Sequence, residues 1–310
     1  MDSMKTRALG SGGPQVPVIC FGAWPISGAL GAVPEDQAIA AVRAAVEVGM
    51  SFMDTAEGYS ASESIIGKTI RGRRHEVFLA TKLSGDHSPE HMARAVENSL
   101  KALGTDYIDL YQLHSPKPRW PTEQTMGHLL RLRDSGKIRY IGVSNFSAEQ
   151  TLEALRYGPV HSSQPLYNML QRGAEESVLP CCLDNGVGVL PYSPLGTGLL
   201  TGRYQPGHRF EPEDIRSQDR ISVWQGENFR RIFEVTQRLE RWALDHGRDL
   251  VQLAIAWTLA HPAVTSSIVG AKSPEQVYHN AKAADWHLTA DDLKEIDEVQ
   301  GDLRLQHISW

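Results

Sequence analysis

Four ionisable side chains follow three short apolar segments that recur about every 30 residues along the sequence. Asp54 and Tyr59 follow one such segment, Lys82 stands 28 residues after Asp54, and His114 stands 32 residues after Lys82. A free tyrosine has a pKa of about 10, so donating its proton at neutral pH requires help from a nearby positive charge, which Lys82 can supply. Asp54 would pair with Lys82, and His114 would hydrogen-bond the oxygen that receives the proton. These residue types are together suited to reducing a carbonyl group.

None of the four side chains carries a hydride, so this chemistry implies a nicotinamide cofactor. A single lysine or histidine at the end of a strand is more often structural than catalytic. Four ionisable groups at matching depths are harder to explain as packing, because a buried ionisable group is costly unless it is paired. The set as a whole therefore predicts a reductive active site.

The elements that must hold these side chains follow from a repeat of about 30 residues, in which segments typical of buried strands alternate with amphipathic segments typical of helices. Eight such units make a closed (β/α)8 TIM barrel, whose active site is built at the C-terminal ends of the strands. The predicted strands are 16–21, 51–54, 77–81, 107–113, 138–143, 162–164, 188–192 and 266–269. The predicted helices are 35–48, 62–71, 89–103, 122–135, 148–156, 174–185, 227–246 and 273–284.

An open, doubly wound sheet is the alternative fold. It would be expected to carry the pattern G-x-G-x-x-G after its first strand, where this sequence reads Phe21-Gly22-Ala23-Trp24-Pro25. The nearest similar stretch, Gly196-Thr197-Gly198, has its next glycine one residue too late, at Gly202. The barrel is therefore favoured.

Two departures from the repeat predict additions to the barrel. Residues 7–9 and 16–18 flank a glycine-rich turn at 10–14, which indicates an N-terminal β-hairpin that plugs one end of the barrel. Between the seventh and eighth strands the chain takes about 75 residues, which predicts a long polar loop at 196–225 and an extra helix at 250–259.

Composition and charge are those of an ordinary globular protein. The 310 residues are 41% hydrophobic and 22% charged, with a formal net charge of −6. The acidic, mixed-sign balance argues against a nucleic-acid or membrane partner, and three cysteines make no disulfide framework or metal site. Residues 1–7 lack the apolar segment of a signal peptide, and no apolar run reaches the roughly 20 residues that span a bilayer. We expect one cytoplasmic domain over residues 1–310 that binds no metal.

The sequence resembles the aldo-keto reductases along essentially its whole length. The motifs that carry the resemblance are GMSFMDTA at 49–56, Tyr59, Glu63 with Gly67, LGTDYIDL at 103–110 before His114, GKIR at 136–139, GVSNF at 142–146 and PYSPL at 191–195. The resemblance implies that Asp54, Tyr59, Lys82 and His114 are the family's catalytic tetrad. It also implies that the nicotinamide cofactor binds in the mouth of the barrel.

The resemblance further implies the residues of the cofactor and substrate sites. Ser144, Asn145 and Gln164 would hold the carboxamide of the nicotinamide, and Tyr192 would stack on its ring. The full implied cofactor set is Gly22, Ala23, Trp24, Asp54, Ser144, Asn145, Gln164, Tyr192, Ser193, Pro194, Leu195, Gly198, Gly270, Lys272, Ser273, Gln276 and Asn280. The substrate site would consist of Trp24, Tyr59, His114, Trp120 and Trp224.

Lys272 lies where the family places the phosphate on the adenosine ribose, which favours NADP(H) over NAD(H). A lysine near a helix N-terminus is otherwise unfavourable, because the helix dipole is positive at that end. The short segment after Gly301 argues against the steroid pocket of some family members. The expected function is NADPH-dependent reduction of aldehydes or ketones. Two alternatives remain, a non-enzymatic subunit that senses nicotinamide and a lyase that forms a Schiff base on Lys82. The substrate, the favoured direction and the oligomeric state stay open.

Overall fold

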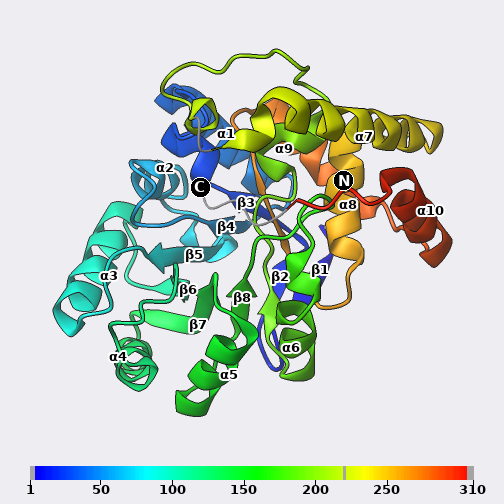
Figure 1. The fold of residues 1–310 in the computed structure, drawn as a ribbon. Coiled ribbons are helices and arrows are strands. Elements are labelled where there is room, and N and C mark those ends of the chain that lie inside the picture. The colour runs from blue at the N-terminus through cyan, green and yellow to red at the C-terminus, as the bar shows by residue number, and fades with distance from the viewer. Residues whose placement is uncertain (1–3, 219–220, 306–310) are drawn as a thin grey trace.

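Eight parallel strands form the centre of the fold (Figure 1). The computed structural model describes residues 4–218 and 221–305. The strands run in the order β10-β3-β4-β5-β6-β7-β8-β9, and parallel bridges between Val189 and Val264 and between Tyr192 and Ile268 join the two edges. The predicted (β/α)8 barrel is therefore confirmed. The bounds are β3 Ile19–Gly22, β4 Phe52–Asp54, β5 Phe78–Leu83, β6 Ile108–Leu113, β7 Ile138–Ser144, β8 Ser162–Gln164, β9 Gly188–Val189 and β10 Ser267–Gly270.

The strand register brings the polar ends of the strands to one level. Asp54 pairs with Gly22 on one side and with Ala80 on the other, Lys82 pairs with Gln112, and Ser144 pairs with Gln164. Because all the strands are parallel, these side chains gather at the same end of the barrel.

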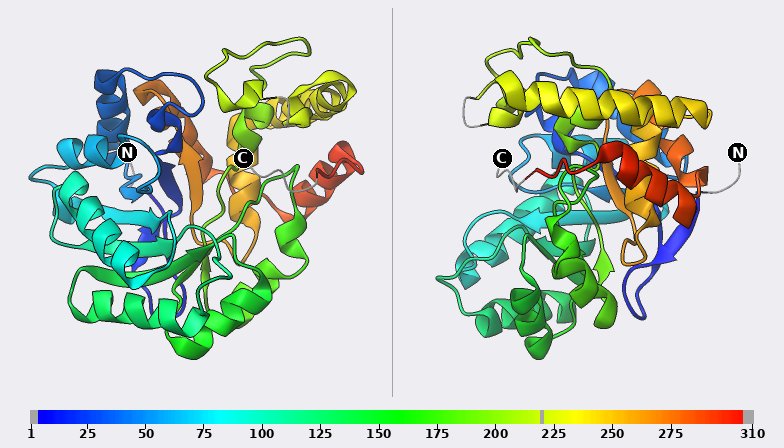
Figure 2. Two further views of the ribbon diagram at one scale, coloured as in Figure 1. Left: turned by 60° about the vertical axis from the view of Figure 1, so that its left-hand side comes forward. Right: turned by 45° about the vertical axis from the view of Figure 1, so that its right-hand side comes forward.

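Ten α-helices occur in the described residues and surround the strands (Figure 2). They are α1 Glu35–Glu47, α2 Ser62–Thr69, α3 Pro89–Leu103, α4 Thr122–Asp134, α5 Ala148–Tyr157, α6 Val178–Asp184, α7 Gly226–Asp245, α8 Leu250–Ala260, α9 Pro274–Ala281 and α10 Ala290–Gln300. Side-chain caps begin several of them: Ser88, Ser147, Asp249, Ser273 and Thr289 each accept a hydrogen bond from a first-turn backbone N–H. None of the helices in the described ranges has the length and apolarity needed to cross a bilayer.

The predicted hairpin is present as β1 (Thr6–Ala8) and β2 (Gln15–Pro17), which pair antiparallel. Leu9 and Val16 are fully buried and share a hydrophobic cluster with barrel residues such as Phe52 and Leu110. A separate, larger cluster packs helices against the outer side of the strands. The hairpin therefore contributes directly to the core inside the barrel.

The elements depart from the sequence prediction at a few places. The first barrel strand begins at Ile19 rather than at residue 16, because residues 15–17 are occupied in the hairpin. The predicted helix 174–185 is a 3-10 turn followed by α6, since the backbone at Ser177 (φ −149°, ψ −40°) leaves the helical region. Helix α10, which was not predicted, packs against α7.

The long connection between β9 and α7 passes the end of β10 and reaches the segment that follows β3. It contains short 3-10 turns rather than regular helix, as the predicted loop at 196–225 requires. The backbone N–H of Ile215 donates to the carbonyl of Ala29 at 3.1 Å, which ties this loop to the segment after β3. Figure 1 shows the loop as a yellow-green trace near α1.

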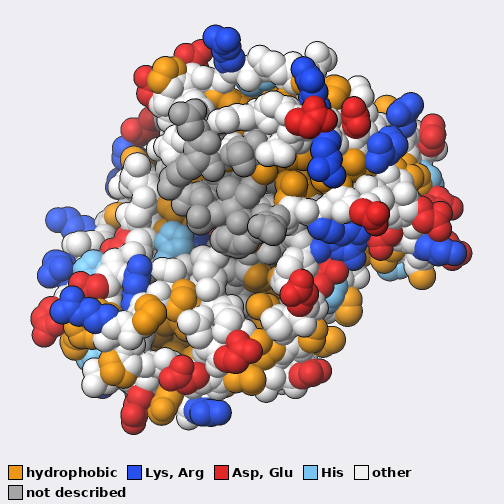
Figure 3. All heavy atoms as spheres, viewed as in Figure 1, with side chains coloured by type: hydrophobic (Ala, Val, Ile, Leu, Met, Phe, Trp, Pro, Cys, Tyr) orange, Lys and Arg blue, Asp and Glu red, His pale blue; other side chains and the backbone are white. Residues whose placement is uncertain are grey.

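Basic and acidic side chains are interspersed over the face of the molecule in Figure 3. This pattern matches the mixed-sign composition. The end of the chain after residue 305 lies outside the described residues, so the expectation about a short C-terminal segment stays a prediction. That residues 1–310 form one domain also stays a prediction.

Candidate active site

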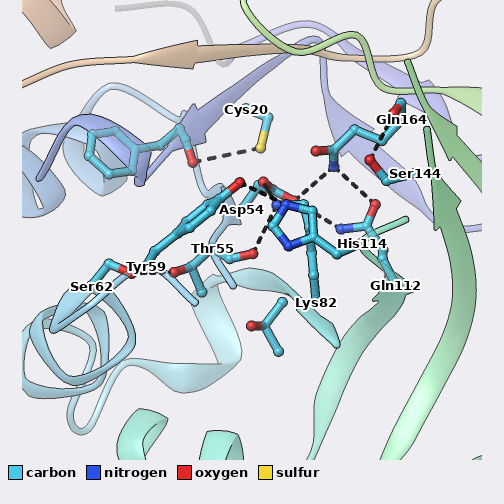
Figure 4. A network of polar contacts seen from close by, with 12 residues as sticks. Cys20, Asp54, Thr55, Tyr59, Ser62, Lys82, Gln112, His114, Ser144 and Gln164 are labelled. Carbon is cyan, nitrogen blue, oxygen red and sulfur yellow. Dashed lines mark hydrogen bonds and ion pairs between the residues drawn. The ribbon is translucent and has the colours of Figure 1, made fainter. Parts of the chain in front are cut away.

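A buried ion pair lies at the centre of the candidate site (Figure 4). Asp54 ends β4 and Lys82 lies near the end of β5, with 2% and 0% of their surfaces exposed. The Lys82 ammonium donates to Asp54 Oδ1 and, at 2.9 Å, to the carbonyl of Thr55. Burial by itself would lower the pKa of Lys82, but the negative charges around it, Asp54 first, raise that pKa above its ordinary value. Lys82 is therefore a fixed positive charge at neutral pH.

The second carboxylate oxygen of Asp54 is held by two glutamines. Nε2 of Gln112 lies 2.9 Å from Asp54 Oδ2 and Nε2 of Gln164 lies 3.0 Å from it, while Gln164 also donates to Gln112 Oε1 at 3.0 Å. These contacts satisfy both carboxylate oxygens of a group that is costly to bury unpaired. The sequence did not predict that Gln112 belongs to the site, because its position in the strand pattern is that of any inward-facing residue of β6.

Tyr59 and His114 lie above the ion pair and contact each other. The hydroxyl of Tyr59 is 3.3 Å from Nε2 of His114, and the Lys82 ammonium is 4.9 Å from the centre of the Tyr59 ring. Burial raises the pKa of the Tyr59 phenol, the charge of Lys82 opposes this, and the charge of Asp54 adds to it. Lys82 acts on the phenol in the direction that the sequence predicts, but burial outweighs it, so the net shift of the phenol pKa is upward. The raised pKa keeps Tyr59 protonated at neutral pH.

His114 is neutral at physiological pH. Burial, followed by the positive charges of Lys82 and Lys117, lowers the pKa of its imidazole to about 3. One ring nitrogen therefore carries a hydrogen and the other a lone pair. Nδ1 lies 2.8 Å from the hydroxyl of Ser84, so both ring nitrogens have polar neighbours.

Two neutral histidines, the buried His87 and the half-buried His114, predict a loss of stability in acid. Burial and the charge of Lys117 lower the pKa of His87 to about 4, and His114 titrates at about 3. An unfolded histidine has a pKa of about 6.5, so below that pH the unfolded chain binds protons that the folded chain does not. The stability that each histidine contributes is present above about pH 6.5 and is lost as the pH falls through its folded pKa.

We expect His87→Gln to reduce the slope of unfolding free energy against pH by about 1.4 kcal/mol per pH unit between roughly pH 6 and pH 4.5. Urea unfolding at a series of pH values measures this slope. Equal slopes for the wild type and the variant would contradict the prediction.

A cavity of about 660 Å³ opens beside Tyr59 and His114. Most residues of the predicted cofactor and substrate sites line it, although they come from distant parts of the sequence. These are Gly22, Ala23, Trp24, Asp54, Tyr59, His114, Ser144, Asn145, Gln164, Tyr192, Ser193, Pro194, Leu195, Gly198, Gly270, Lys272, Gln276 and Asn280.

Four predicted site residues do not line the cavity. Lys82 is wholly buried in the ion pair, and Ser273 caps α9 by accepting from the backbone N–H of Gln276. Trp224 is 6% exposed and packs edge-on against the rings of Tyr204 and Phe210. Trp120 lies in the loop after His114, with the guanidinium of Arg119 5.6 Å from its ring centre. Of the three predicted indoles, only Trp24 lies on the cavity wall.

Hydrogen bonds fix the polar wall near His114. Asn145 has a left-handed backbone (φ 59°), and its amide donates to the carbonyl of His114 at 3.0 Å. The Tyr192 hydroxyl donates to Asn145 Oδ1 at 3.0 Å, and the Ser144 hydroxyl donates to the carbonyl of Gln164 at 2.9 Å. This wall presents amide and hydroxyl groups in fixed positions.

The other end of the cavity is rich in positive charge. Lys272, Arg203 and Arg216 line it, and Lys272 donates to the carbonyl of Leu30. Burial and the charges of Arg216 and Arg203 lower the pKa of Lys272, while Asp214 opposes the shift. Sequence reasoning missed the two arginines, because a long loop does not reveal which of its charges turn inward.

Arg216 anchors the long loop at this end. Its guanidinium makes two hydrogen bonds to Asp214, at 2.9 and 2.6 Å, and a third to the Tyr204 hydroxyl at 3.0 Å. A Cβ atom at Gly198, whose φ is +109°, would approach Arg216 Nη1 to 3.0 Å. Glycine therefore allows the cavity wall to pass close to the anchored arginine.

The cavity fits a nicotinamide dinucleotide. Its volume lies within the range of small-molecule sites, a proton-donating phenol lies at one end and three cationic side chains lie at the other, where phosphates would be neutralised. A parallel barrel with these features at the C-terminal ends of its strands is the arrangement of an oxidoreductase.

Comparisons with known proteins identify the family. The sequence model described as "Aldo/keto reductase family" matches residues 18–300. The aldo-keto reductase YhdN of Bacillus subtilis (strain 168) is 37% identical over 311 residues, which cover 96% of this chain and 93% of that protein. The aldo-keto reductase yakc of Schizosaccharomyces pombe, whose name includes NADP(+), is 33% identical over 96% of this chain and 92% of its own.

A solved structure of a related enzyme has the same fold. The glycerol dehydrogenase AKR11B4 from Gluconobacter oxydans superposes with a TM-score of 0.87 at 30% identity, over 96% of this chain and 95% of that one. The chain belongs to the aldo/keto reductase family, and it is an oxidoreductase that reduces carbonyl compounds to alcohols with a nicotinamide cofactor.

Proposed function

We propose that this protein reduces aldehydes or ketones with NADPH and that Tyr59 donates the proton. One observation carries the proposal: a buried Lys82–Asp54 ion pair lies beneath Tyr59 and His114 at one end of a cavity whose other end is cationic. The bound cofactor would supply a hydride to the carbonyl carbon.

Each of the four residues has a separate task in this mechanism. Tyr59 gives its phenolic proton to the carbonyl oxygen as negative charge develops there. Lys82 stabilises the phenolate that remains, and Asp54 keeps Lys82 charged and in position. His114, being neutral, hydrogen-bonds the carbonyl oxygen and orients it without competing for the proton.

The polar and cationic walls are assigned to the cofactor. Ser144, Asn145 and Gln164 would hold its carboxamide, and Tyr192 would lie against its ring. Lys272, Arg203 and Arg216 would contact its phosphates. The hydrogen bonds that already fix Asn145 and Gln164 favour this role, because a preorganised wall loses little entropy on binding.

A panel of aldehydes and ketones tests the reaction. We expect NADPH absorbance at 340 nm to fall with at least one of them, for example 4-nitrobenzaldehyde, and the corresponding alcohol to accumulate in equal amount. Tight NADPH binding without turnover on any member would instead favour the subunit that senses nicotinamide.

The preference for NADP(H) is proposed on Lys272 and on the name of the yeast relative, which includes NADP(+). A hydrogen bond to a charged group is worth roughly 1.5–3 kcal/mol, or about 10- to 150-fold in affinity. We therefore expect Lys272→Ala to weaken NADPH binding by that order and to leave NADH binding nearly unchanged. Fluorescence titration of both cofactors measures this. Equal NADPH and NADH dissociation constants in the wild type would contradict the preference.

A Schiff-base lyase is disfavoured by the state of Lys82. Nucleophilic attack needs a neutral amine, whereas the pKa of Lys82 is raised by its ion pair with Asp54. Failure of borohydride to trap a carbonyl compound on Lys82 is the expected result. The cytoplasmic location and the absence of a nucleic-acid partner stay predictions of the sequence.

A further inference from the structure

We propose that Ser84 sets the tautomer of His114. In this arrangement the Ser84 hydroxyl donates to Nδ1 of His114, Nε2 carries the hydrogen toward the carbonyl oxygen, and Glu57 holds Ser84 in position. The direction assigned to this hydrogen bond rests on the proposed function, in which His114 donates from Nε2 to the carbonyl oxygen, whereas the tautomer itself is measured without cofactor or substrate.

Ser84 contacts His114 directly and lies beside the other candidate catalytic residues. Ser84 directly follows β5, two residues after Lys82, so the same strand that positions the ammonium also positions the hydroxyl. The Ser84 oxygen lies 2.8 Å from Nδ1 of His114, whereas Nε2 lies 3.3 Å from the Tyr59 hydroxyl. The shorter contact is at the nitrogen that faces away from Tyr59.

The direction of this hydrogen bond decides what Nε2 can do. If Nδ1 carried the hydrogen, Nε2 would be a lone pair that accepts the Tyr59 proton, and His114 would have nothing to donate to a carbonyl oxygen. If Ser84 donates to Nδ1, Nε2–H is a donor and Tyr59 keeps its proton for the substrate. A hydroxyl can act as the donor that this second arrangement requires, and Ser84 is the hydroxyl at Nδ1.

Glu57 fixes the backbone that presents Ser84. Its Oε1 accepts the backbone N–H of Ser84 at 2.6 Å and that of Gly85 at 3.2 Å. Because Glu57 lies two residues before Tyr59, one carboxylate ties the loop that carries the phenol to the loop that carries the hydroxyl. His91, from α3, lies with Nε2 3.4 Å from the same Oε1.

Gly85 makes this close packing possible. A Cβ atom at residue 85 would lie 2.1 Å from Nε2 of His91, so any side chain here would displace the imidazole from its position. In the loop after β5, Glu57 therefore accepts hydrogen bonds from two backbone N–H groups, and the His91 ring packs against the backbone of Gly85. Both contacts restrict where the Ser84 hydroxyl can point.

Nitrogen-15 NMR of histidine-labelled protein reads the tautomer directly, without cofactor or substrate. The chain has 12 histidines, and the signals that disappear in His114→Gln assign those of His114. We expect wild-type His114 to carry its hydrogen on Nε2, Ser84→Ala to move it substantially toward Nδ1, and Ser84→Thr, which keeps the hydroxyl, to resemble the wild type. A wild-type hydrogen on Nδ1, or an unchanged tautomer in Ser84→Ala, would overturn the proposal.

Glu57→Ala tests the positioning of Ser84 separately, because this variant keeps the Ser84 hydroxyl and removes the carboxylate that holds its backbone. We expect its His114 signals to shift in the same direction as those of Ser84→Ala, although Ser84 is still present. Wild-type signals in Glu57→Ala would refute the role given to Glu57. Should a variant fail to fold, the wild-type spectrum still decides the tautomer.

Kinetics distinguish this inference from the proposed function. We expect Ser84→Ala to lower kcat for carbonyl reduction about tenfold, the effect of one hydrogen bond of typical net strength, with an unchanged NADPH dissociation constant and with recovery in Ser84→Thr. A tautomer that moves while the rate stays constant would support the Ser84 assignment and contradict the proposed role of His114. A rate that falls while the tautomer stays constant would overturn the inference.

Discussion

Tyr59→Phe is expected to lower kcat for carbonyl reduction by about 10²–10⁴-fold, the usual effect of losing a general acid. The variant removes one oxygen and keeps the ring that lies beside Lys82 and His114. The wall assigned to the cofactor is untouched, so the NADPH dissociation constant should stay within about twofold of the wild type. Steady-state kinetics and fluorescence titration measure the two quantities.

Tyr278→Phe is the matched control for this variant. Tyr278 is 41% exposed on α9, its hydroxyl bonds Glu47 on the surface, and it does not line the cavity. Its loss should leave kcat unchanged. If Tyr59→Phe also retained wild-type activity with full cofactor occupancy, Tyr59 would not be the proton donor.

Lys82→Met is expected to abolish measurable activity and to destabilise the fold. The side chain is wholly buried, and its removal leaves the Asp54 carboxylate buried with two amide donors but no positive charge. Breaking a buried ion pair in this way costs about 3–5 kcal/mol. Urea unfolding at pH 7 should report a loss of this order, and Tyr59 should lose the charge that stabilises its phenolate.

A second substitution separates the structural role of Lys82 from its catalytic role. Adding Asp54→Asn to Lys82→Met removes both charges, so most of the lost stability should return. Activity should not return, because the phenolate that forms at Tyr59 would still lack its neighbouring ammonium. If the double variant recovered activity together with stability, Lys82 would be a structural residue only.

The sequence by itself was enough to predict the barrel and the four residues at its mouth. Apolar segments repeating about every 30 residues required strand–helix units, and eight parallel strands in the sheet confirm this. Asp54, Lys82 and His114 each stand at the end of such a segment. Since parallel strands end at one edge, position along the strand already determined that these side chains would meet.

The tertiary structure alone decided which neighbours complete the site. Gln112 was an ordinary inward-facing strand residue until the register placed it beside Lys82 and against Asp54. Arg216 turned out to line the cavity, whereas Trp224 of the same long loop packs away from it. Loop side chains have no periodicity that fixes their direction, so only long-range packing determines which of them turn inward.

The electrostatics of the site also came from the folded structure. The sequence predicted the sign of the effect that Lys82 has on Tyr59, but the net shift of the phenol pKa depends on burial, which outweighs it. The neutral state of His114 has the same origin, because burial is the largest cause of its lowered pKa. Residue types and spacing determine which charges can meet, while the depth at which they are buried, and hence their protonation, is a property of the packed barrel.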